Sequence, residues 1–81
     1  MIVNVLYFAE ARERVGRPLE PVEIEDGAHL EDVLALLERL HPELAPLWPH
    51  LAVAVDGVLA ARAAVLREGA EIALLPPVSG G

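Results

Sequence analysis

The apolar positions near the start of the chain fall into two runs that predict two strands. Residues 2–9 are almost all apolar, with β-branched and aromatic members, which is typical of a buried strand. Residues 19–25 alternate between apolar and polar side chains, which indicates a second strand. Pro21 lies within this run and favours a position at the edge of the sheet, because proline cannot donate a ladder hydrogen bond. The polar segment between the two runs, residues 10–17, is predicted to form a turn.

Residues 30–40 show the clearest helical pattern in the chain. At 100° per residue, their large apolar side chains fall within an arc of roughly 160°. Charged side chains occupy most of the other side, so we expect one amphipathic helix packed on a core. Pro42 disfavours helical geometry at His41, and the helix should therefore end there. The apolar stripe consists of Leu30, Val33, Leu34, Leu36, Leu37 and Leu40.

The second half of the chain predicts three shorter strands. Residues 41–50 contain three prolines and are expected to form a loop with one short helical turn. Residues 51–55 form an apolar run, and Asp56-Gly57 after them is a strong hairpin signal, with Val58 and Leu59 beginning the return strand. Residues 60–67 fit helix, strand or loop equally well. Residues 71–75 predict the last strand.

The order of these elements predicts an α+β fold of the β-grasp, ubiquitin-like type. A hairpin of two strands, a helical crossover and three further strands give a mixed sheet of about five strands, with one main helix on one face. A ferredoxin-like domain would need a second long helix, and no segment after residue 51 predicts one. We expect residues 1–75 to form the domain and residues 76–81 to form a flexible C-terminal Gly-Gly tail.

Composition and charge exclude several classes of function. The net charge of −7 argues against nucleic acid and anionic membranes as partners and suits a protein with a basic face. There is no cysteine, so disulfides and thiol chemistry are excluded. No apolar run approaches the roughly 18 residues of a membrane span, and no basic segment precedes the first apolar run. We therefore expect a soluble, cytoplasmic protein.

The residues needed for a catalytic site of its own are also scarce. Ser79 is the only serine and threonine is absent, which leaves little for a Ser-His-Asp arrangement. His29, His41 and His50 lie in separate segments, so we predict no metal site. The chain has no glycine-rich phosphate loop. We expect that it is not catalytic alone and binds no cofactor stably.

The end of the chain is the strongest candidate for chemistry. Pro76 and Pro77 fix φ and exclude helix, and Val78, Ser79, Gly80 and Gly81 follow with little capacity to pack. Six extended residues can reach roughly 20 Å. Such a slender arm can enter a tunnel too narrow for a Cβ atom. We therefore predict that the carboxylate of Gly81 is the reactive group.

Three stretches of the chain resemble the small, sulfur-carrier subunit of molybdopterin synthase. They are residues 5–9 (VLYFA), residues 53–57 (VAVDG) and above all residues 75–81 (LPPVSGG). The resemblance implies that a ubiquitin-activating-type enzyme uses ATP to adenylate Gly81 and that a sulfur donor converts it to a thiocarboxylate. The arm then enters the large synthase subunit and gives its sulfur to cyclic pyranopterin monophosphate in molybdenum cofactor biosynthesis. Two large and two small subunits would form a heterotetramer.

Other readings of the same tail stay open. A related carrier for thiamine synthesis or tRNA thiolation would use the same terminal thiocarboxylate. A ubiquitin-like tag would instead be attached to lysines of other proteins through Gly81. A simple interaction module with an incidental tail would tolerate loss of Gly81.

Strand parity predicts a docking patch on the face that the helix leaves open. Successive side chains of a strand point to opposite faces. Phe8 and Leu75 therefore share the open face, and Leu59 is placed beside them. The resemblance implies partner contacts at these three positions. The alternative is that the loop of residues 41–50 folds over them.

Overall fold

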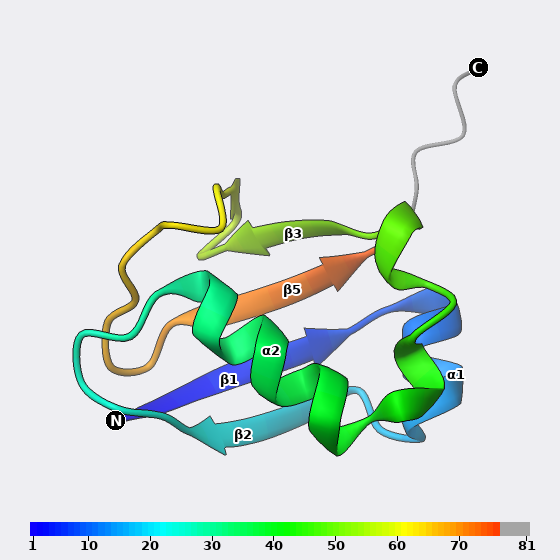
Figure 1. Cartoon of the computed structure of the whole chain (residues 1–81). Helices are drawn as coiled ribbons and strands as arrows, with labels where there is room; N and C mark the ends of the chain where they lie inside the picture. Colours follow the sequence, from blue (N-terminus) through cyan, green and yellow to red (C-terminus); the bar gives the residue numbers. More distant parts are fainter. Residues whose placement is uncertain (77–81) are drawn as a thin grey trace.

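A computed structural model of the chain describes residues 1–76, and Figure 1 shows how its elements are arranged. Strands and helices alternate in the first half, and three strands fill the second half. The elements are β1 (Ile2–Tyr7), α1 (Ala9–Val15), β2 (Leu19–Glu23), α2 (Leu30–Leu40), the 3₁₀ turns η1 (Pro42–Leu44) and η2 (Trp48–His50), β3 (Ala52–Val55), β4 (Val58–Leu59) and β5 (Glu71–Leu75).

The strands form one mixed sheet in the order β2-β1-β5-β3-β4. β1 and β5 pair in parallel at its centre, and the other pairs are antiparallel. The helix α2 crosses in front of this sheet (Figure 1). This arrangement confirms the predicted β-grasp fold. The predicted edge position of Pro21 is also confirmed, because β2 is the first strand of the sheet.

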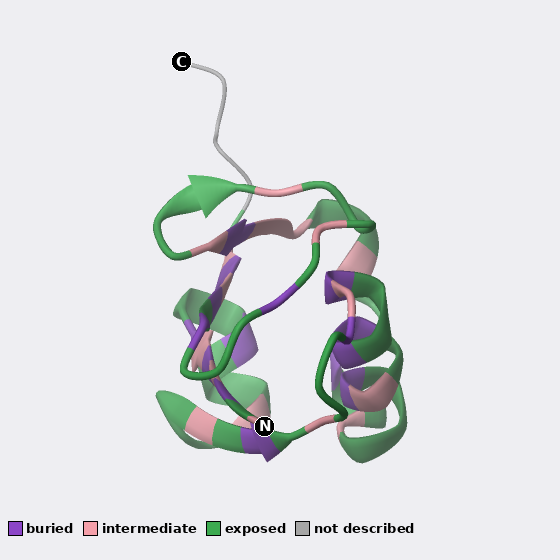
Figure 2. Cartoon of the chain, turned by 90° about the vertical axis from the view of Figure 1, so that its left-hand side faces the viewer, coloured by how far each residue is buried: buried purple, intermediate pink, exposed green. Residues whose placement is uncertain are grey.

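The core lies between the sheet and α2, and Figure 2 shows the buried residues gathered between these two layers. In β1 burial alternates, so that Val3, Val5 and Tyr7 point to the helix side. In β5 the alternate residues Ile72 and Leu74 do the same. The helix contributes the buried side chains Leu30, Val33, Leu34 and Leu37. Leu40 belongs to the predicted stripe but is 51% exposed, because it lies in the last turn of the helix.

The predicted turn at residues 10–17 is wrong, because this segment forms the helix α1. It is only seven residues long and buries a single side chain, Ala11. A helix with one buried position shows no apolar periodicity, so composition suggested a turn. Arg14 and Glu10, one helical turn apart, pair at 3.1 Å. Gly16 ends the helix in the left-handed conformation (φ 86°), and its N–H donates to the carbonyl of Arg12.

The two segments left open by the sequence also take defined forms. Residues 41–50 contain two 3₁₀ turns where one helical turn was expected, and Leu44 in the first of them is fully buried. Residues 60–67 are neither helix nor a named strand. They lie along the start of α2, where Val65 forms an isolated bridge with His29 and the N–H of Leu66 donates to the carbonyl of Ala28 at 2.9 Å.

Leu37→Ala is expected to lower the free energy of unfolding by about 2–5 kcal/mol, because it opens a cavity where α2 meets the sheet. Leu37 is fully buried in the core cluster. Leu40→Ala is the matched control on the same helix, and it should cost less than about 1 kcal/mol. Urea denaturation followed by circular dichroism gives both values. Equal losses for the two variants would contradict the assigned orientation of α2.

Candidate functional site

The face of the sheet opposite α2 carries a continuous row of apolar side chains. Register pairs Leu6 of β1 with Leu19 of β2 on one side and with Ala73 of β5 on the other. Ala73 in turn pairs with Ala54 of β3, and Ala54 pairs with Leu59 of β4. Paired residues point to the same face of a sheet. The row therefore crosses all five strands, and we call it, together with Phe8 and Leu75, the apolar face.

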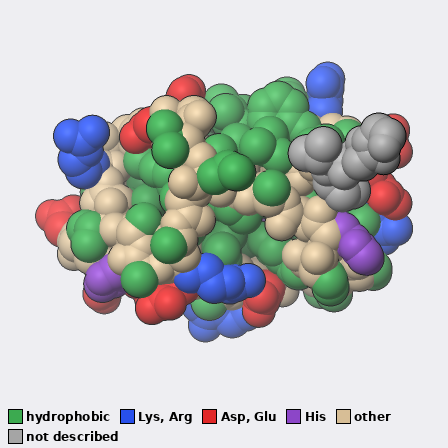
Figure 3. All heavy atoms as spheres, turned by 90° about the horizontal axis from the view of Figure 1, so that it is seen from above, with side chains coloured by type: hydrophobic (Ala, Val, Ile, Leu, Met, Phe, Trp, Pro, Cys, Tyr) green, Lys and Arg blue, Asp and Glu red, His purple; other side chains and the backbone are tan. Residues whose placement is uncertain are grey.

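The structure places the three predicted docking residues on or beside this face. Leu75 ends β5 opposite Ala52, and Leu59 is 70% exposed on β4. Phe8 follows β1 as the N-cap residue of α1 and is 43% exposed. The loop of residues 41–50 therefore leaves the side chains of Leu59 and Phe8 accessible. Figure 3 views the molecule from above Figure 1, on the side of the sheet where β3 lies, and hydrophobic side chains gather in the middle of that surface.

Strand register also adds Leu19 to this face, which the sequence did not identify. Leu19 is 40% exposed and stands beside Leu6. Its position depends on how β2 is aligned with β1, and no local pattern in the sequence fixes that alignment. The residue could have been found only by assuming the register of the first hairpin.

The predicted tail begins at the end of β5. Pro76 is exposed, and it lines a hollow of about 480 Å³ together with residues of the β1–α1 junction and of the loop before β3. The remaining predicted tail residues lie outside the described part of the chain: Pro77, Val78, Ser79, Gly80 and Gly81. What the structure fixes is the starting point of the tail, at one end of the central strand pair β1–β5.

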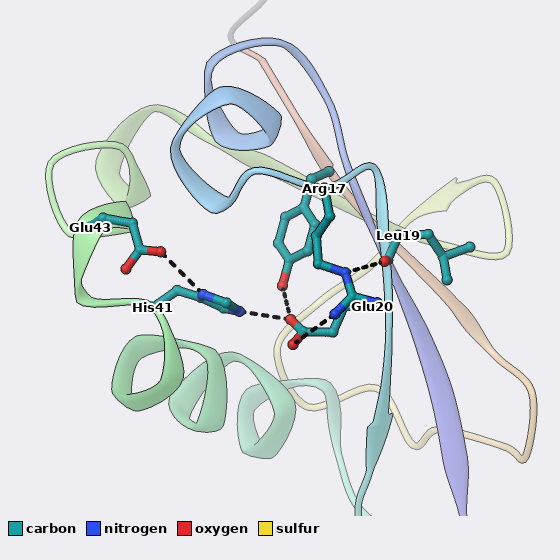
Figure 4. A network of polar contacts seen from close by, with 6 residues as sticks. Arg17, Leu19, Glu20, His41 and Glu43 are labelled. Carbon is teal, nitrogen blue, oxygen red and sulfur yellow. Dashed lines mark hydrogen bonds and ion pairs between the residues drawn. The ribbon is translucent and has the colours of Figure 1, made fainter.

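A polar network that the sequence did not predict lies on the α2 side of the sheet, at the end where β1 and β5 finish. Glu20 accepts hydrogen bonds from the Tyr7 hydroxyl at 2.7 Å, and its Oε1 is also 2.7 Å from Nε2 of His41. Nδ1 of His41 lies 3.2 Å from Glu43. Arg17 is 3.9 Å from the other oxygen of Glu20 and donates to the carbonyl of Leu19 (Figure 4). These contacts join β1, β2 and the end of α2.

This network shifts the acid–base properties of two of its members. Burial and the hydrogen bond to Glu20 raise the pKa of Tyr7 far above its ordinary value. Burial alone would raise the pKa of Glu20. The hydrogen bonds from Tyr7 and His41, with the charges of His41 and Arg17, outweigh burial and lower it. The arrangement favours the carboxylate form of Glu20 and the neutral phenol of Tyr7.

Glu20→Gln is expected to lower the melting temperature near neutral pH by an amount that disappears in acid. Because the folded-state pKa of Glu20 lies below its unfolded value, the carboxylate stabilises the fold above the unfolded pKa of about 4.3. That contribution is lost as the pH falls through the folded pKa. Thermal melts between about pH 7 and pH 3 should show the two proteins converge. Glu38→Gln, on the exposed side of α2, should match wild type throughout. A gap of constant size across this range would contradict the assigned role.

Two other features bear on function within residues 1–76. This part of the chain contains no cluster of three or more histidine, aspartate or glutamate side chains that could hold a metal ion. His29 and His41 flank the two ends of α2, and His50 ends η2. Neither helix in this part is long and apolar enough to cross a membrane.

Comparison with known proteins assigns the chain to a family. Residues 5–81 match the family model described as ThiS family. The chain belongs to the ThiS family. This ThiS-family chain is 39% identical to the molybdopterin synthase sulfur carrier subunit of Chlamydomonas reinhardtii over 83 residues, and the match covers 100% of both chains.

Solved structures support the same assignment of the fold. A crystal structure of small archaeal modifier protein 1 from Haloferax volcanii superposes on this ThiS-family chain with a TM-score of 0.88 and 30% identity, covering 100% of both chains. A chain of the protein–protein complex of subunits 1 and 2 of molybdopterin-converting factor from Helicobacter pylori matches with a TM-score of 0.76 and 27% identity. That match also covers 100% of both chains.

Proposed function

We propose that this chain is the sulfur-carrier subunit of a molybdopterin synthase and that Gly81 carries the sulfur as a thiocarboxylate. The observation that carries the proposal is the end-to-end match, at 39% identity, to a relative that is a molybdopterin synthase sulfur carrier subunit. Because the match covers 100% of both chains, Gly80 and Gly81 lie within the aligned span. The exposed position of Pro76 at the end of β5 supports the role of the residues that follow it.

The chemistry follows from the carboxylate of Gly81. A carboxylate oxygen attacks the α-phosphorus of ATP in an activating enzyme of the ubiquitin-activating type, and pyrophosphate leaves. A donor supplying sulfur at the level of hydrosulfide then attacks the acyl carbon, and AMP leaves. In the synthase, the thiocarboxylate sulfur forms a bond to a carbon of cyclic pyranopterin monophosphate as the bond from that carbon to an oxygen substituent breaks, and the oxygen group leaves. Water then hydrolyses the acyl–sulfur bond, which leaves sulfur on the substrate and restores the carboxylate.

The apolar face is the proposed docking surface for the large synthase subunit. Leu59 and Phe8 are large apolar side chains left exposed, 70% and 43% respectively, which is typical of a surface that a partner covers. The H. pylori structure is a complex of subunits 1 and 2 of molybdopterin-converting factor, which supports a partner of this kind. The net charge of −7 favours a partner with a basic rim. Two carriers and two large subunits would give the heterotetramer.

Intact mass spectrometry tests the proposed function directly. The chain is incubated with the activating enzyme, ATP and a sulfur donor. The expected product is heavier by the difference between one sulfur and one oxygen, and fragmentation should place the change at Gly81. Omission of ATP should leave the mass unchanged. Formation of no such product by the wild-type chain, with an activating enzyme that is active on its own carrier, would overturn the proposal.

A second candidate function has a specific observation in its favour. Small archaeal modifier protein 1 is 30% identical to this chain and superposes with a TM-score of 0.88. A modifier would use the same activated Gly81 but transfer it to a lysine amine of another protein. Covalent adducts of this chain on other proteins, detected by mass spectrometry after activation, would favour this function. Accumulation of free thiocarboxylate favours the sulfur carrier.

A further inference from the structure

An apolar hollow lies beside the base of the tail and adjoins the apolar face at Phe8. It is the hollow of about 480 Å³ that Pro76 lines, here called the tail-base hollow. Three separate segments meet there: the β1–α1 junction, the loop before β3 and the end of β5. Its lining residues include Phe8, Ala11, Leu47, His50, Leu51 and Pro76.

The walls of the tail-base hollow are mostly apolar, and three of its lining residues pack in or against the core. Leu47 and Leu51 pack against the core on one side, and Ala11 is buried at 1% exposure on the other. Ala9 turns the chain from β1 into α1 in the left-handed conformation, with φ 49°. A non-glycine residue keeps that conformation only where its surroundings hold it. Glu10 is exposed and adds a polar group to the lining.

The position of this hollow determines what can fill it. Residues 77–81 follow Pro76 in the chain, so a protein that binds them binds close to the wall that Pro76 forms. Phe8 lines the hollow and also belongs to the apolar face, which makes the two surfaces continuous. Interface anchors are typically apolar or aromatic side chains seated in such pockets.

A second, larger hollow of about 730 Å³ is neither next to the tail nor continuous with the apolar face. It is lined by Met1, by residues 23–28 and by one side of α2, and four of its lining residues are carboxylates. None of the residues at the end of β5 lines it. It therefore supplies control positions of similar burial that do not adjoin the tail.

We infer that the tail-base hollow receives one aliphatic or aromatic side chain of the large synthase subunit. This side chain would lock the base of the tail while residues 77–81 enter the active site. The inference rests on the proposed function. It adds Leu47, His50 and Leu51 to the interface, none of which the sequence identified as contacts.

Photo-crosslinking tests the inference without disturbing the core. p-Benzoylphenylalanine replaces His50 on the exposed rim of the tail-base hollow, and Arg39 in the second hollow as control. With the purified large synthase subunit, the His50 probe should crosslink to an apolar residue of that subunit and the Arg39 probe should not. A His50 probe that fails to crosslink while a probe at Leu59 succeeds would overturn the inference, as would a crosslink only to a second copy of this chain.

Affinity measurements give an independent readout. Leu47→Asn and Leu51→Asn place a polar group in the hollow, and each should weaken binding to the large subunit by about tenfold or more. Leu36→Asn is the matched control, because Leu36 is also a partly buried leucine packed against the core. Melting temperatures identify variants that fail to fold. Unchanged affinity in the folded hollow variants would overturn the inference and leave the thiocarboxylate chemistry at Gly81 intact, whereas absence of any thiocarboxylate would remove both.

Discussion

Deletion of Gly81 is expected to abolish sulfur transfer completely while leaving the fold unchanged. In the proposed mechanism the terminal carboxylate is the only group that is adenylated, so its displacement by one residue moves the acyl carbon out of the activating site. A misplacement of about 1 Å can already cost on the order of a hundredfold in rate. The fold should be unaffected, because the sheet and its core are complete at Leu75. The measurement is product formation with the large synthase subunit, beside a thermal melt of the same sample.

Two further variants separate the chemistry of the terminus from its shape. Addition of one residue after Gly81 should have the same effect as the deletion, because it also moves the carboxylate. Gly80→Val keeps the carboxylate in place but adds a branched side chain next to it, and it should block activation by steric hindrance. A Gly81 deletion that still supports sulfur transfer would exclude the carrier mechanism. Normal adenylation of Gly80→Val would show that the activating site is not a narrow tunnel.

Phe8→Ala, Leu59→Ala and Leu75→Ala are each expected to weaken binding to the large synthase subunit by about tenfold or more. Their side chains lie on or beside the face of the sheet that α2 does not cover. Loss of an apolar anchor removes contact area in the complex but opens no cavity in the free chain. The thermal stability of these variants should therefore stay close to that of wild type. Isothermal titration calorimetry with the large subunit gives the affinities.

Two core variants serve as controls that distinguish loss of binding from loss of stability. Val5→Ala and Leu37→Ala remove fully buried side chains and should reduce the melting temperature far more than the three patch variants. Once folded, the core variants should bind the large subunit normally. If the patch variants lost as much stability as the core variants and bound normally, the apolar face would be part of the folding core and the docking assignment would be wrong.

The sequence by itself determined the main helix and strands, because apolar side chains recur in them at the spacing of a helix or a strand. Residues 30–40 have a helical apolar stripe, and in residues 71–75 four apolar residues follow Glu71 and precede a proline; both elements appear with those bounds. Parity within β1 and β5 also sorted their side chains correctly between the two faces. The proposed reactive group at Gly81 stays a prediction from the sequence, because residues 77–81 lie outside the described part of the chain.

Tertiary structure decided what depends on register and on contacts distant in sequence. The helix α1 has one buried position, so its side chains show no period, and it lies against η1 some thirty residues later in the chain. Leu19 joined the apolar face through the pairing of β2 with β1, and a slip of one residue would have turned it to the other face. The tail-base hollow and the Glu20–His41 contact arise because distant segments meet at one end of the sheet. Local sequence patterns do not predict such contacts. They indicate which side of its own helix or strand a residue occupies, and they do not indicate which other element packs against that side.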